Sequence, residues 1–338
     1  MLKKLHKSLT LLKKEAKSKK CKTALVVTVT TQSLDKYPKI FPLRHMENYV
    51  CLPIGIKNDV SGRKLAEYFD GKVDVIFVDS ENKLPTCTNL SRKIINAVCR
   101  SKVYIIKGND FSADAAFSLV CTVMKSIVAK KICVIGAGNI GSKVALKFIE
   151  CGARVFILNA TEKSTVQTAN AINMIKPKGC KNRIVAITNG KIPKNLDCVI
   201  GFTRGIPVIT KEIVSLVKNN GLILDGGSGT ISYDGIEEAK KRKLNVLRLD
   251  IRMGFISFAS LMLNTEKLMT NIAGMRKIHR VKIVAGGYIG TKGDVVVDNI
   301  KEPKEVLGVS DGKGSFLSDY TLYKDNVVKI SEMIENSK

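Results

Sequence analysis

The sequence contains no tryptophan, only 6% aromatic residues and no long apolar run. Apolar stretches such as residues 25–29 and 75–78 are far shorter than the roughly 20 residues that a membrane-spanning helix needs. We therefore expect no membrane span. Few aromatic side chains are present to stack on bases, and the lysines are spread along the chain, so we also expect no specific nucleic-acid partner.

Potential metal ligands are scarce too. The chain has three histidines, and its nine cysteines never occur as C-x-x-C, so the ligand spacing of a metal site is missing. We expect no metal. An odd number of cysteines, some of them inside apolar segments (Cys133 and Cys198), is typical of free thiols in a reducing compartment. The composition thus predicts a cytoplasmic protein.

Positive charge, in contrast, is abundant. A formal net charge of +26 would attract acidic substrates and phosphorylated cofactors. Residues 1–22 hold nine lysines and one glutamate, with Leu2, Leu5, Leu9 and Leu12 at helical spacing. This pattern predicts a basic amphipathic helix that lies on its own domain or on a second subunit, with a membrane-surface or nucleic-acid arm as the alternative.

The most informative motif is G-x-G-x-x-G at residues 136–141, which follows the apolar segment 131–135. In such a loop Gly136 permits the tight turn, Gly138 lets the backbone approach a pyrophosphate, and Gly141 lets the following helix pack closely on the strand. The helix N-terminus would then bind phosphate. A glycine-rich turn that serves only helix packing is the alternative.

The context of the motif favours a dinucleotide site, because a helical pattern and a second apolar strand at 154–158 follow it. We expect these loop residues to contact the cofactor: Gly136, Gly138, Asn139, Ile140 and Gly141.

Strands and helices alternate around this motif. Six strands are predicted, at residues 131–135, 154–158, 183–187, 197–202, 221–224 and 246–251. Six strands with intervening helices are what a doubly wound, dinucleotide-binding (Rossmann) domain with a parallel sheet requires. The same alternation ahead of the motif predicts a separate α/β substrate domain.

The predicted organisation therefore has four parts, which are the basic amphipathic helix (1–22), the α/β substrate domain (23–110), the Rossmann domain (111–255) and a final segment (256–338). The final segment starts with a helix, at 257–275, that is apolar on most faces, so we expect it to be buried between domains or subunits. Beyond that helix, glycines and alternating Val or Ile predict a β-rich part, formed either by hairpins or by an extended return to the first domain.

The residue at the end of the second Rossmann strand distinguishes NAD-binding from NADP-binding domains. An acid there would bind the ribose 2′-hydroxyl of NAD, but this chain has Asn159. A 2′-phosphate is then not repelled, and Lys163 could pair with it while Thr161 donates a hydrogen bond. The sequence favours NADP and leaves NAD open.

This strand end resembles the shikimate dehydrogenase-like NADP domains, which include shikimate and quinate dehydrogenases and, more distantly, glutamyl-tRNA reductase. Asn159 and Thr161 match the family's N-R-T, Lys163 follows closely, and residues 136–138 match its glycine loop. Ala160 replaces the Arg that binds the 2′-phosphate in the family. The resemblance covers about residues 105–230 and implies an NADP-binding Rossmann domain. Residues 199–227 also resemble the NAD domain of 2-hydroxyacid dehydrogenases and adenosylhomocysteinases.

The family also places N-T-D about 25 residues before the glycine loop, with the Asp beside the substrate. Here residues 107–110 read Lys-Gly-Asn-Asp, so the Thr is missing, and the family's S-x-S and N-V-T-x-P-x-K segments are absent from residues 20–75. The resemblance therefore implies a substrate other than shikimate.

Lys107 and Asp110 are the first candidates for proton transfer, with Asn109 beside them as a substrate contact, because they follow a strand at the edge where ligands of such folds bind. The alternative is an ordinary surface ion pair. His45 could act as acid or base, because histidine is the side chain suited to proton exchange near neutral pH, or it could be structural.

At the end of the fourth Rossmann strand, Thr203 is expected to contact the cofactor. Arg204 beside it could hold a substrate carboxylate with both nitrogens, or it could be an exposed arginine in a turn.

Together these features predict an NAD(P)-dependent oxidoreductase that transfers hydride between nicotinamide and a small polar, anionic substrate, either carbonyl and alcohol or imine and amine. A non-redox lyase or hydrolase that recycles bound NAD, and a non-catalytic dinucleotide sensor, are the alternatives. We also expect a homo-oligomer, with a dimer as the simplest form.

Overall fold

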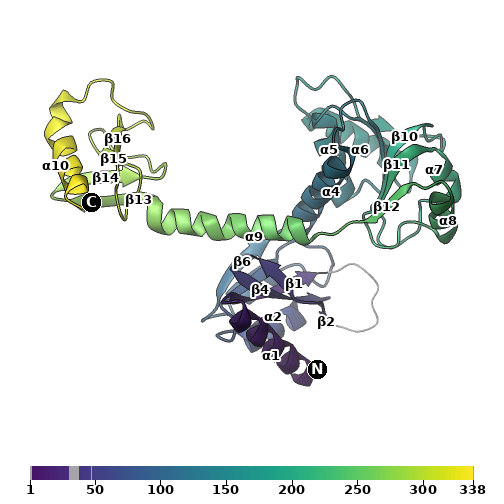
Figure 1. The fold of residues 1–338 in the computed structure, drawn as a ribbon, viewed down its shortest axis with the longest axis horizontal. Helices are drawn as coiled ribbons and strands as arrows, with labels where there is room; N and C mark the ends of the chain where they lie inside the picture. The colour runs from purple at the N-terminus through teal and green to yellow at the C-terminus, as the bar shows by residue number, and fades with distance from the viewer. Residues whose placement is uncertain (1, 30–37, 47, 338) are drawn as a thin grey trace. The chain divides into compact units, whose positions relative to one another are not determined.

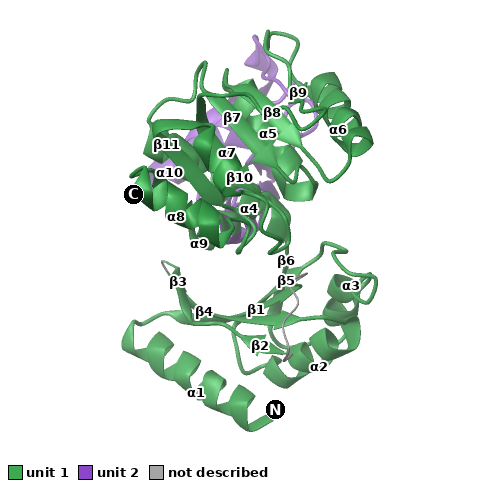
Figure 2. Cartoon of the chain, turned by 90° about the vertical axis from the view of Figure 1, so that its right-hand side faces the viewer, with its two compact units in different colours: residues 1–258 green, residues 259–338 purple. Residues whose placement is uncertain are grey.

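In the computed structural model, which describes residues 2–29, 38–46 and 48–337, the chain is an α/β protein with parallel sheets and a β-rich C-terminal part, as the sequence predicts. Two compact units divide it, residues 1–258 and 259–338 (Figure 2). Among the described residues, no helix is both long and apolar enough to cross a lipid bilayer.

The first sheet of unit 1 has a parallel centre. Its strands follow the order β2-β4-β1-β5-β6, with β3 paired to β4, and β2 and β3 run antiparallel to β4. The strands are β1 (Lys22–Val29), β2 (Lys39–Ile40), β3 (Arg44–Met46), β4 (Tyr49–Ile56), β5 (Val75–Asp79) and β6 (Lys102–Ile106). Continuous apolar runs such as β4 and β5 are buried on both faces, which is typical of parallel strands covered by helices. The covering helices include α2 (Asp59–Phe69) and α3 (Leu90–Ile95).

The N-terminal helix α1 (Leu2–Ser18) lies on this same sheet (Figure 1). Leu5, Leu9, Leu12 and Ala16 are buried in the core that also holds residues of β1 and β4. The helix therefore uses its apolar face inside its own domain, which is one of the two placements that its sequence pattern predicts, while the lysines stay on the solvent side.

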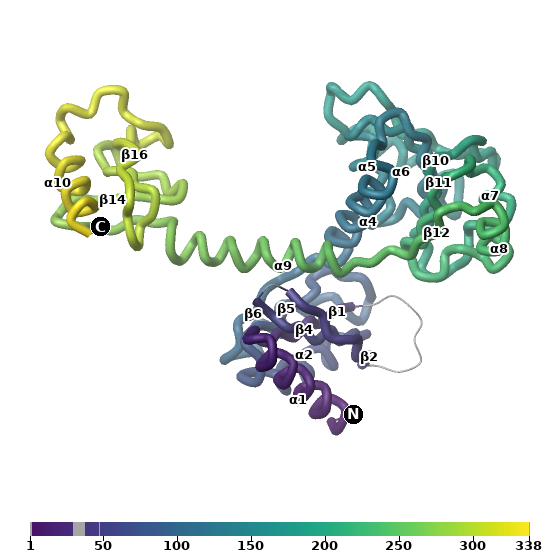
Figure 3. Tube along the Cα trace, viewed as in Figure 1, coloured from purple at the N-terminus to yellow at the C-terminus, as the bar shows by residue number. Residues whose placement is uncertain are grey.

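Helix α4 (Gly108–Met124) leads from β6 into the second sheet of unit 1, and its path can be followed in Figure 3. This sheet has six strands among the described residues, in the order β12-β11-β10-β7-β8-β9. They are β7 (Lys131–Ile135), β8 (Arg154–Leu158), β9 (Val185–Ala186), β10 (Leu196–Gly201), β11 (Val217–Asp225) and β12 (Asn245–Arg248). Numbered from β7, the order is 3-2-1-4-5-6, the doubly wound arrangement that binds dinucleotides where the order reverses.

All six predicted Rossmann strands are present, although β9 is shorter than predicted, and the covering helices are α5 (Asn139–Glu150), α6 (Glu162–Ile175), α7 (Lys211–Ser215) and α8 (Tyr233–Lys241). One boundary differs in a way that concerns the site. The predicted Rossmann domain begins at residue 111, but helix α4, which leads into it, begins at Gly108, so Asn109 and Asp110 lie in its first turn.

Helix α9 (Arg252–Lys267) begins in unit 1 and ends in unit 2, where a π-helical turn, η1 (Leu268–Ile272), follows it. The helix starts earlier and ends earlier than the predicted 257–275. Leu261 and Met269 are exposed within the single chain, so the described chain does not provide the burial that the sequence predicts. Burial against a second subunit stays a prediction.

Unit 2 forms a sheet of its own with strand order β13-β14-β15-β16, and no described strand of it joins the first sheet. The hairpin alternative therefore holds for β13 and β14, which pair antiparallel. Its elements are β13 (Gly274–Ile278), β14 (Val281–Ala285), β15 (Val295–Val297), β16 (Val306–Val309), the 3-10 turn η2 (Thr321–Tyr323) and helix α10 (Lys324–Glu335). Ile330 and Ile334 of α10 pack on valines of this sheet and give the unit a separate core.

Candidate active site

A cavity of about 780 Å³ lies in unit 1 between the carboxyl-end edge of the first sheet and the glycine loop of the Rossmann sheet. This volume is within the range of small-molecule sites. Residues of both sheets line it. From the first sheet and α4 come Val26, Thr28, Val29, Phe41, Arg44, Pro53, Glu81, Asn82, Lys83, Ile106, Gly108, Asn109, Phe111 and Ser112. From the Rossmann half and α9 come Gly136, Gly138, Asn139, Ile140, Phe202, Arg204, Gly226, Gly227, Ser228, Leu249, Ile251 and Phe255.

The three glycines of the loop differ in their surroundings. Gly136 has a φ of +85°, which side chains rarely adopt. A Cβ on Gly141 would lie 2.5 Å from the carbonyl oxygen of Gly136, so the start of α5 packs directly on the loop. Gly138 lines the cavity, and a Cβ there would meet no atom within 4 Å. The loop therefore leaves open space in front of the first backbone N–H groups of α5, which fits a pyrophosphate.

The residues at the end of β8 lie outside the cavity lining. The Asn159 side chain donates to Thr168 Oγ1 at 3.2 Å, and Thr161 Oγ1 caps α6 by accepting from the Ser164 N–H at 3.2 Å. Lys163 is exposed in the first turn of α6. The nearest acid in sequence, Glu162, accepts a hydrogen bond from the backbone N–H of Asn189. The strand thus ends on Asn159 and not on an acid, and the exposed Lys163 is the nearest cation in sequence.

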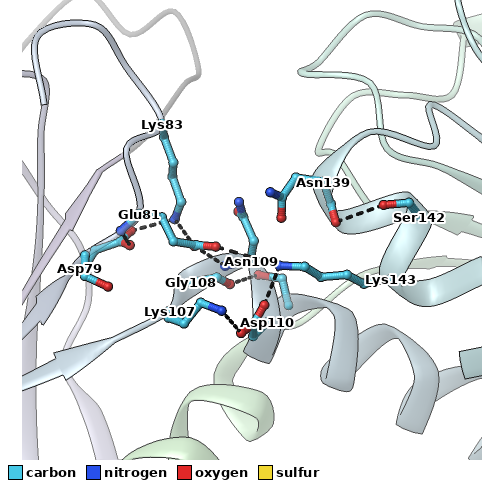
Figure 4. A network of polar contacts seen from close by, with 12 residues as sticks. Asp79, Glu81, Lys83, Lys107, Gly108, Asn109, Asp110, Asn139, Ser142 and Lys143 are labelled. Carbon is cyan, nitrogen blue, oxygen red and sulfur yellow. Dashed lines mark hydrogen bonds and ion pairs between the residues drawn. The ribbon is translucent and has the colours of Figure 1, made fainter. Parts of the chain in front are cut away.

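A half-buried lysine, Lys83, occupies the wall formed by the first sheet (Figure 4). The Lys83 ammonium lies 2.6 Å from Asp79 Oδ2 and 3.3 Å from Glu81 Oε2, and its side chain is only 12% exposed. The Asp79 side chain, at the carboxyl end of β5, is fully buried. Glu81 Oε2 also accepts the backbone N–H of Asn109 at 2.6 Å, which ties the loop after β5 to the first turn of α4.

Gly108 leaves room for this arrangement. A Cβ on Gly108 would clash with Lys83 Nζ and would lie 3.2 Å from Asp79 Oδ2. The ammonium therefore rests directly on the first residue of α4, and any side chain there would displace it.

Lys107 and Asp110 are brought together but do not line the cavity. Lys107 Nζ lies 2.6 Å from Asp110 Oδ2, and Lys143 of α5 binds Asp110 Oδ1 (Figure 4). Burial tends to raise the pKa of Asp110, but hydrogen bonds from Lys107 and Lys143 outweigh it and place the pKa below its usual range. The bond to Asp110 raises the pKa of Lys107. Both groups are therefore charged at neutral pH, and they link α4 to the helix of the glycine loop.

At the end of β10, Arg204 lines the cavity and is exposed, whereas Thr203 does not line it. The Thr203 hydroxyl donates to the carbonyl of Ile206. Across from this strand end, the loop 226–230 is anchored by the buried Asp225, which accepts from the Thr230 hydroxyl at 2.8 Å. Asp225 thus holds in place the loop whose Gly226, Gly227 and Ser228 line the cavity.

The structure places His45 away from the cavity. His45 Nε2 lies 3.7 Å from Glu15 of α1, and its side chain is 44% exposed. The preceding residue, Arg44, lines the cavity instead. Because side chains alternate across a strand, only one of these two neighbours can face the cavity. It is Arg44, whereas His45 was the residue predicted from the sequence.

Sequence reasoning also missed Lys83, Asp79 and Glu81. A usable signal was present, because Asp79 directly follows the apolar stretch 75–78 and would stand at the edge where parallel strands end. Among the described residues no group of His, Cys, Asp and Glu side chains could hold a metal ion.

Comparison with known proteins supports the Rossmann half. Residues 131–200 match a family model described as NADP oxidoreductase, coenzyme F420-dependent. This match agrees with the resemblance to NADP-binding oxidoreductase domains and supports a nicotinamide dinucleotide as cofactor. No curated protein sequence matches the chain.

Solved structures resemble the chain only distantly. Dipicolinate synthase A chain from Bacillus subtilis is 13% identical, with a TM-score of 0.36, and the alignment covers 73% of this chain and 97% of that one. Shikimate dehydrogenase from Aquifex aeolicus is 15% identical, with a TM-score of 0.44 and coverage of 71% and 93%. L-tryptophan dehydrogenase from Nostoc punctiforme is 14% identical, with a TM-score of 0.40 and coverage of 63% of each chain. At these values the likenesses carry no argument about activity.

Proposed function

We propose that the protein is an NAD(P)-dependent oxidoreductase that exchanges hydride with a small anionic substrate, either carbonyl and alcohol or imine and amine. One observation carries the proposal. The glycine loop, with Gly138 facing open space, and the charged wall with Lys83 and Asn109 line one and the same cavity. A dinucleotide and a polar substrate can therefore meet in it.

The residues present fit a dinucleotide. The first turn of α5, at Asn139 and Ile140, would hold the pyrophosphate, and the backbone of residues 226–228 would line the site opposite it. We favour NADP, because Lys163 is available for a 2′-phosphate and Asn159 replaces the acid that NAD enzymes place there. When bound, the nicotinamide supplies or accepts the hydride.

For the proton we propose Lys83. Its ammonium is held by two carboxylates and faces the cavity, so it can donate a proton to a substrate oxygen or nitrogen as hydride reaches the carbon, and recover it in reverse. Asp110 and Lys107, which the sequence suggested for this step, then act as positioning residues, because Asp110 pairs with both Lys107 and Lys143 of α5 and so fixes α4 against α5. Arg204 would bind a substrate carboxylate.

The first test is titration with NADPH and NADH, followed by the fluorescence of the bound nicotinamide. Gly138→Asp places a carboxylate where the pyrophosphate would lie and should abolish binding. Gly179→Asp is the matched control, because Gly179 is exposed, outside the cavity lining, and a Cβ there meets no atom within 4 Å. If neither nucleotide binds the wild-type protein, or if Gly138→Asp binds it normally, the proposal is wrong.

A second test addresses the chemistry. Lys83→Met should leave NADPH affinity unchanged but remove turnover on a panel of carbonyl acids, whereas Lys107→Met should retain measurable turnover. Equal losses in the two variants would contradict the role given to Lys83. Nicotinamide that co-purifies with the protein, without net turnover, would instead favour internal recycling of NAD.

A further inference from the structure

The charged groups around the cavity fall into two sets: those that form ion pairs within the protein and those that do not. Three lysines (Lys83, Lys107 and Lys143) and three carboxylates (Asp79, Glu81 and Asp110) form one network, shown in Figure 4, in which the formal charges cancel. Arg44 and Arg204 line the cavity outside this network. Within the described part of the chain, neither guanidinium forms an ion pair or a hydrogen bond. Among the described residues, the cavity therefore presents two positive charges without an ion-pair partner.

Arg44 is the stronger indication of an anionic ligand, because it is partly buried whereas Arg204 is exposed. Burial lowers the pKa of Arg44 and Arg252 acts in the same direction, while Asp250 opposes them. Asp250 is already engaged, since its carboxylate accepts the backbone N–H of Arg252 at 2.9 Å and the Arg252 side chain at 2.6 Å. A partly desolvated cation without a paired anion is costly, and an arriving carboxylate would offset that cost through two parallel hydrogen bonds.

Much of the remaining lining is apolar, and it includes several aromatic rings. Four of the eleven phenylalanines of the chain, Phe41, Phe111, Phe202 and Phe255, line this cavity. Phe111 and Phe255 meet edge to face, with ring centroids 5.9 Å apart, so part of the wall is a rigid aromatic pair. Such a surface favours a flat apolar body over a flexible polyol.

We propose that the substrate of this site is a carboxylic acid with a planar, apolar body, whose carboxylate is bound by Arg44. Arg204, on the Rossmann side, supplies the second cation for an anionic group nearer the nicotinamide. The assignment rests on the proposed oxidoreductase function for the reaction, but the acid-binding subsite can be measured without turnover.

Benzoate is a suitable probe, with benzamide as the uncharged analogue of the same shape and acetate as the acid without a ring. Each is titrated calorimetrically into the NADPH-saturated protein. Benzoate should bind saturably, and benzamide and acetate should each bind at least about tenfold more weakly, as expected when a charge-assisted pair or an aromatic contact is missing.

Arg44→Gln should weaken benzoate by at least about tenfold and leave benzamide unchanged, because only the charge-assisted bonds are lost. Arg44→Lys keeps the charge without the two-nitrogen geometry, so its affinity for benzoate should lie between those of wild type and Arg44→Gln. Arg183→Gln is the control, since Arg183 is exposed and lies outside the cavity lining. Thermal melting of each variant shows whether it is folded.

NADPH affinity distinguishes a failure of the acid-binding subsite from a failure of the proposed oxidoreductase function. If NADPH binds, but benzoate fails to bind, binds no better than benzamide, or binds Arg44→Gln as well as wild type, then the acid subsite is refuted and the oxidoreductase proposal stands. If NADPH does not bind the wild-type protein, the proposed function itself fails.

Discussion

Gly138 and Gly141 belong to one motif, yet the structure predicts that alanine fails at each for a different reason. A Cβ on Gly141 would lie 2.5 Å from the carbonyl oxygen of Gly136 and 3.3 Å from a methyl group of Val134. The closer atom belongs to the backbone of the loop, so it cannot rotate away. A Cβ on Gly138 meets nothing within 4 Å, and its φ of −77° is one that any residue adopts.

The magnitudes follow from these contacts. Overpacking costs about 1–3 kcal/mol, while alanine in a helix gains about 1 kcal/mol over glycine. Because the clash is with backbone, we expect Gly141→Ala to lose about 1–2 kcal/mol of stability, which lowers Tm by roughly 2–8 °C for a unit of this size. Gly138→Ala should leave the free energy of unfolding within about 0.5 kcal/mol of wild type. Its methyl group, however, occupies the place of the pyrophosphate, so NADPH affinity should fall by at least about tenfold.

Circular dichroism melting and NADPH fluorescence titration measure the two quantities separately, and Gly179→Ala serves as the control for a glycine in open space. Gly141→Ala should lose both stability and affinity, and Gly138→Ala affinity alone. The reasoning is refuted if Gly138→Ala melts as early as Gly141→Ala, or if it binds NADPH as tightly as wild type.

Four further outcomes are expected. The folded pKa of Asp110 is depressed, so its contribution to stability is present above the unfolded pKa of about 3.9 and lost as pH falls through the folded value; the Tm difference between wild type and Asp110→Asn should begin to shrink below about pH 4 and vanish below the folded pKa, and a constant difference would count against it. Asp225→Ala should cost about 2–4 kcal/mol, because it leaves the loop 226–230 and Arg248 without their buried acceptor, and urea unfolding measures this. In the native protein Cys99 and Cys151 should react first with a thiol reagent, since both are exposed, while burial raises the pKa of Cys133 to about 12; rapid labelling of Cys133 in a peptide map would contradict this. Light scattering should find a dimer, and Leu261→Lys on α9 should shift it toward monomer if that helix is the interface.

Much of the fold could be predicted because its signals are local. The Rossmann strands are continuous apolar runs, and the glycine loop lies where one of them meets a helix, so order along the chain was enough to assign the domain. The start of α4 was harder to predict from the sequence. Residues 108–110 have the composition of a loop, and only the contact of Lys83 with Gly108 explains why a glycine opens this helix.

The site was harder to predict because it is made by tertiary contacts. Lys83 is separated from Asn109 and Lys143 by tens of residues, and nothing in its own neighbourhood marks it as buried. His45 and Arg44 are adjacent, and only their alternation along β3 decides that the arginine faces the cavity and the histidine faces α1. The sequence predicts patterns within a single strand or helix, but it does not predict which strand ends lie together in the folded protein.

The contact between Lys83 and Gly108 also constrains how this protein can evolve. A Cβ at 108 would meet the tip of the Lys83 side chain and Asp79 Oδ2, so alanine there would move the ammonium from its present place. The first turn of a helix, in contrast, prefers alanine over glycine by up to about 1 kcal/mol. We therefore expect relatives that keep lysine at 83 to keep glycine at 108, and alanine at 108 to be commoner where that lysine is absent.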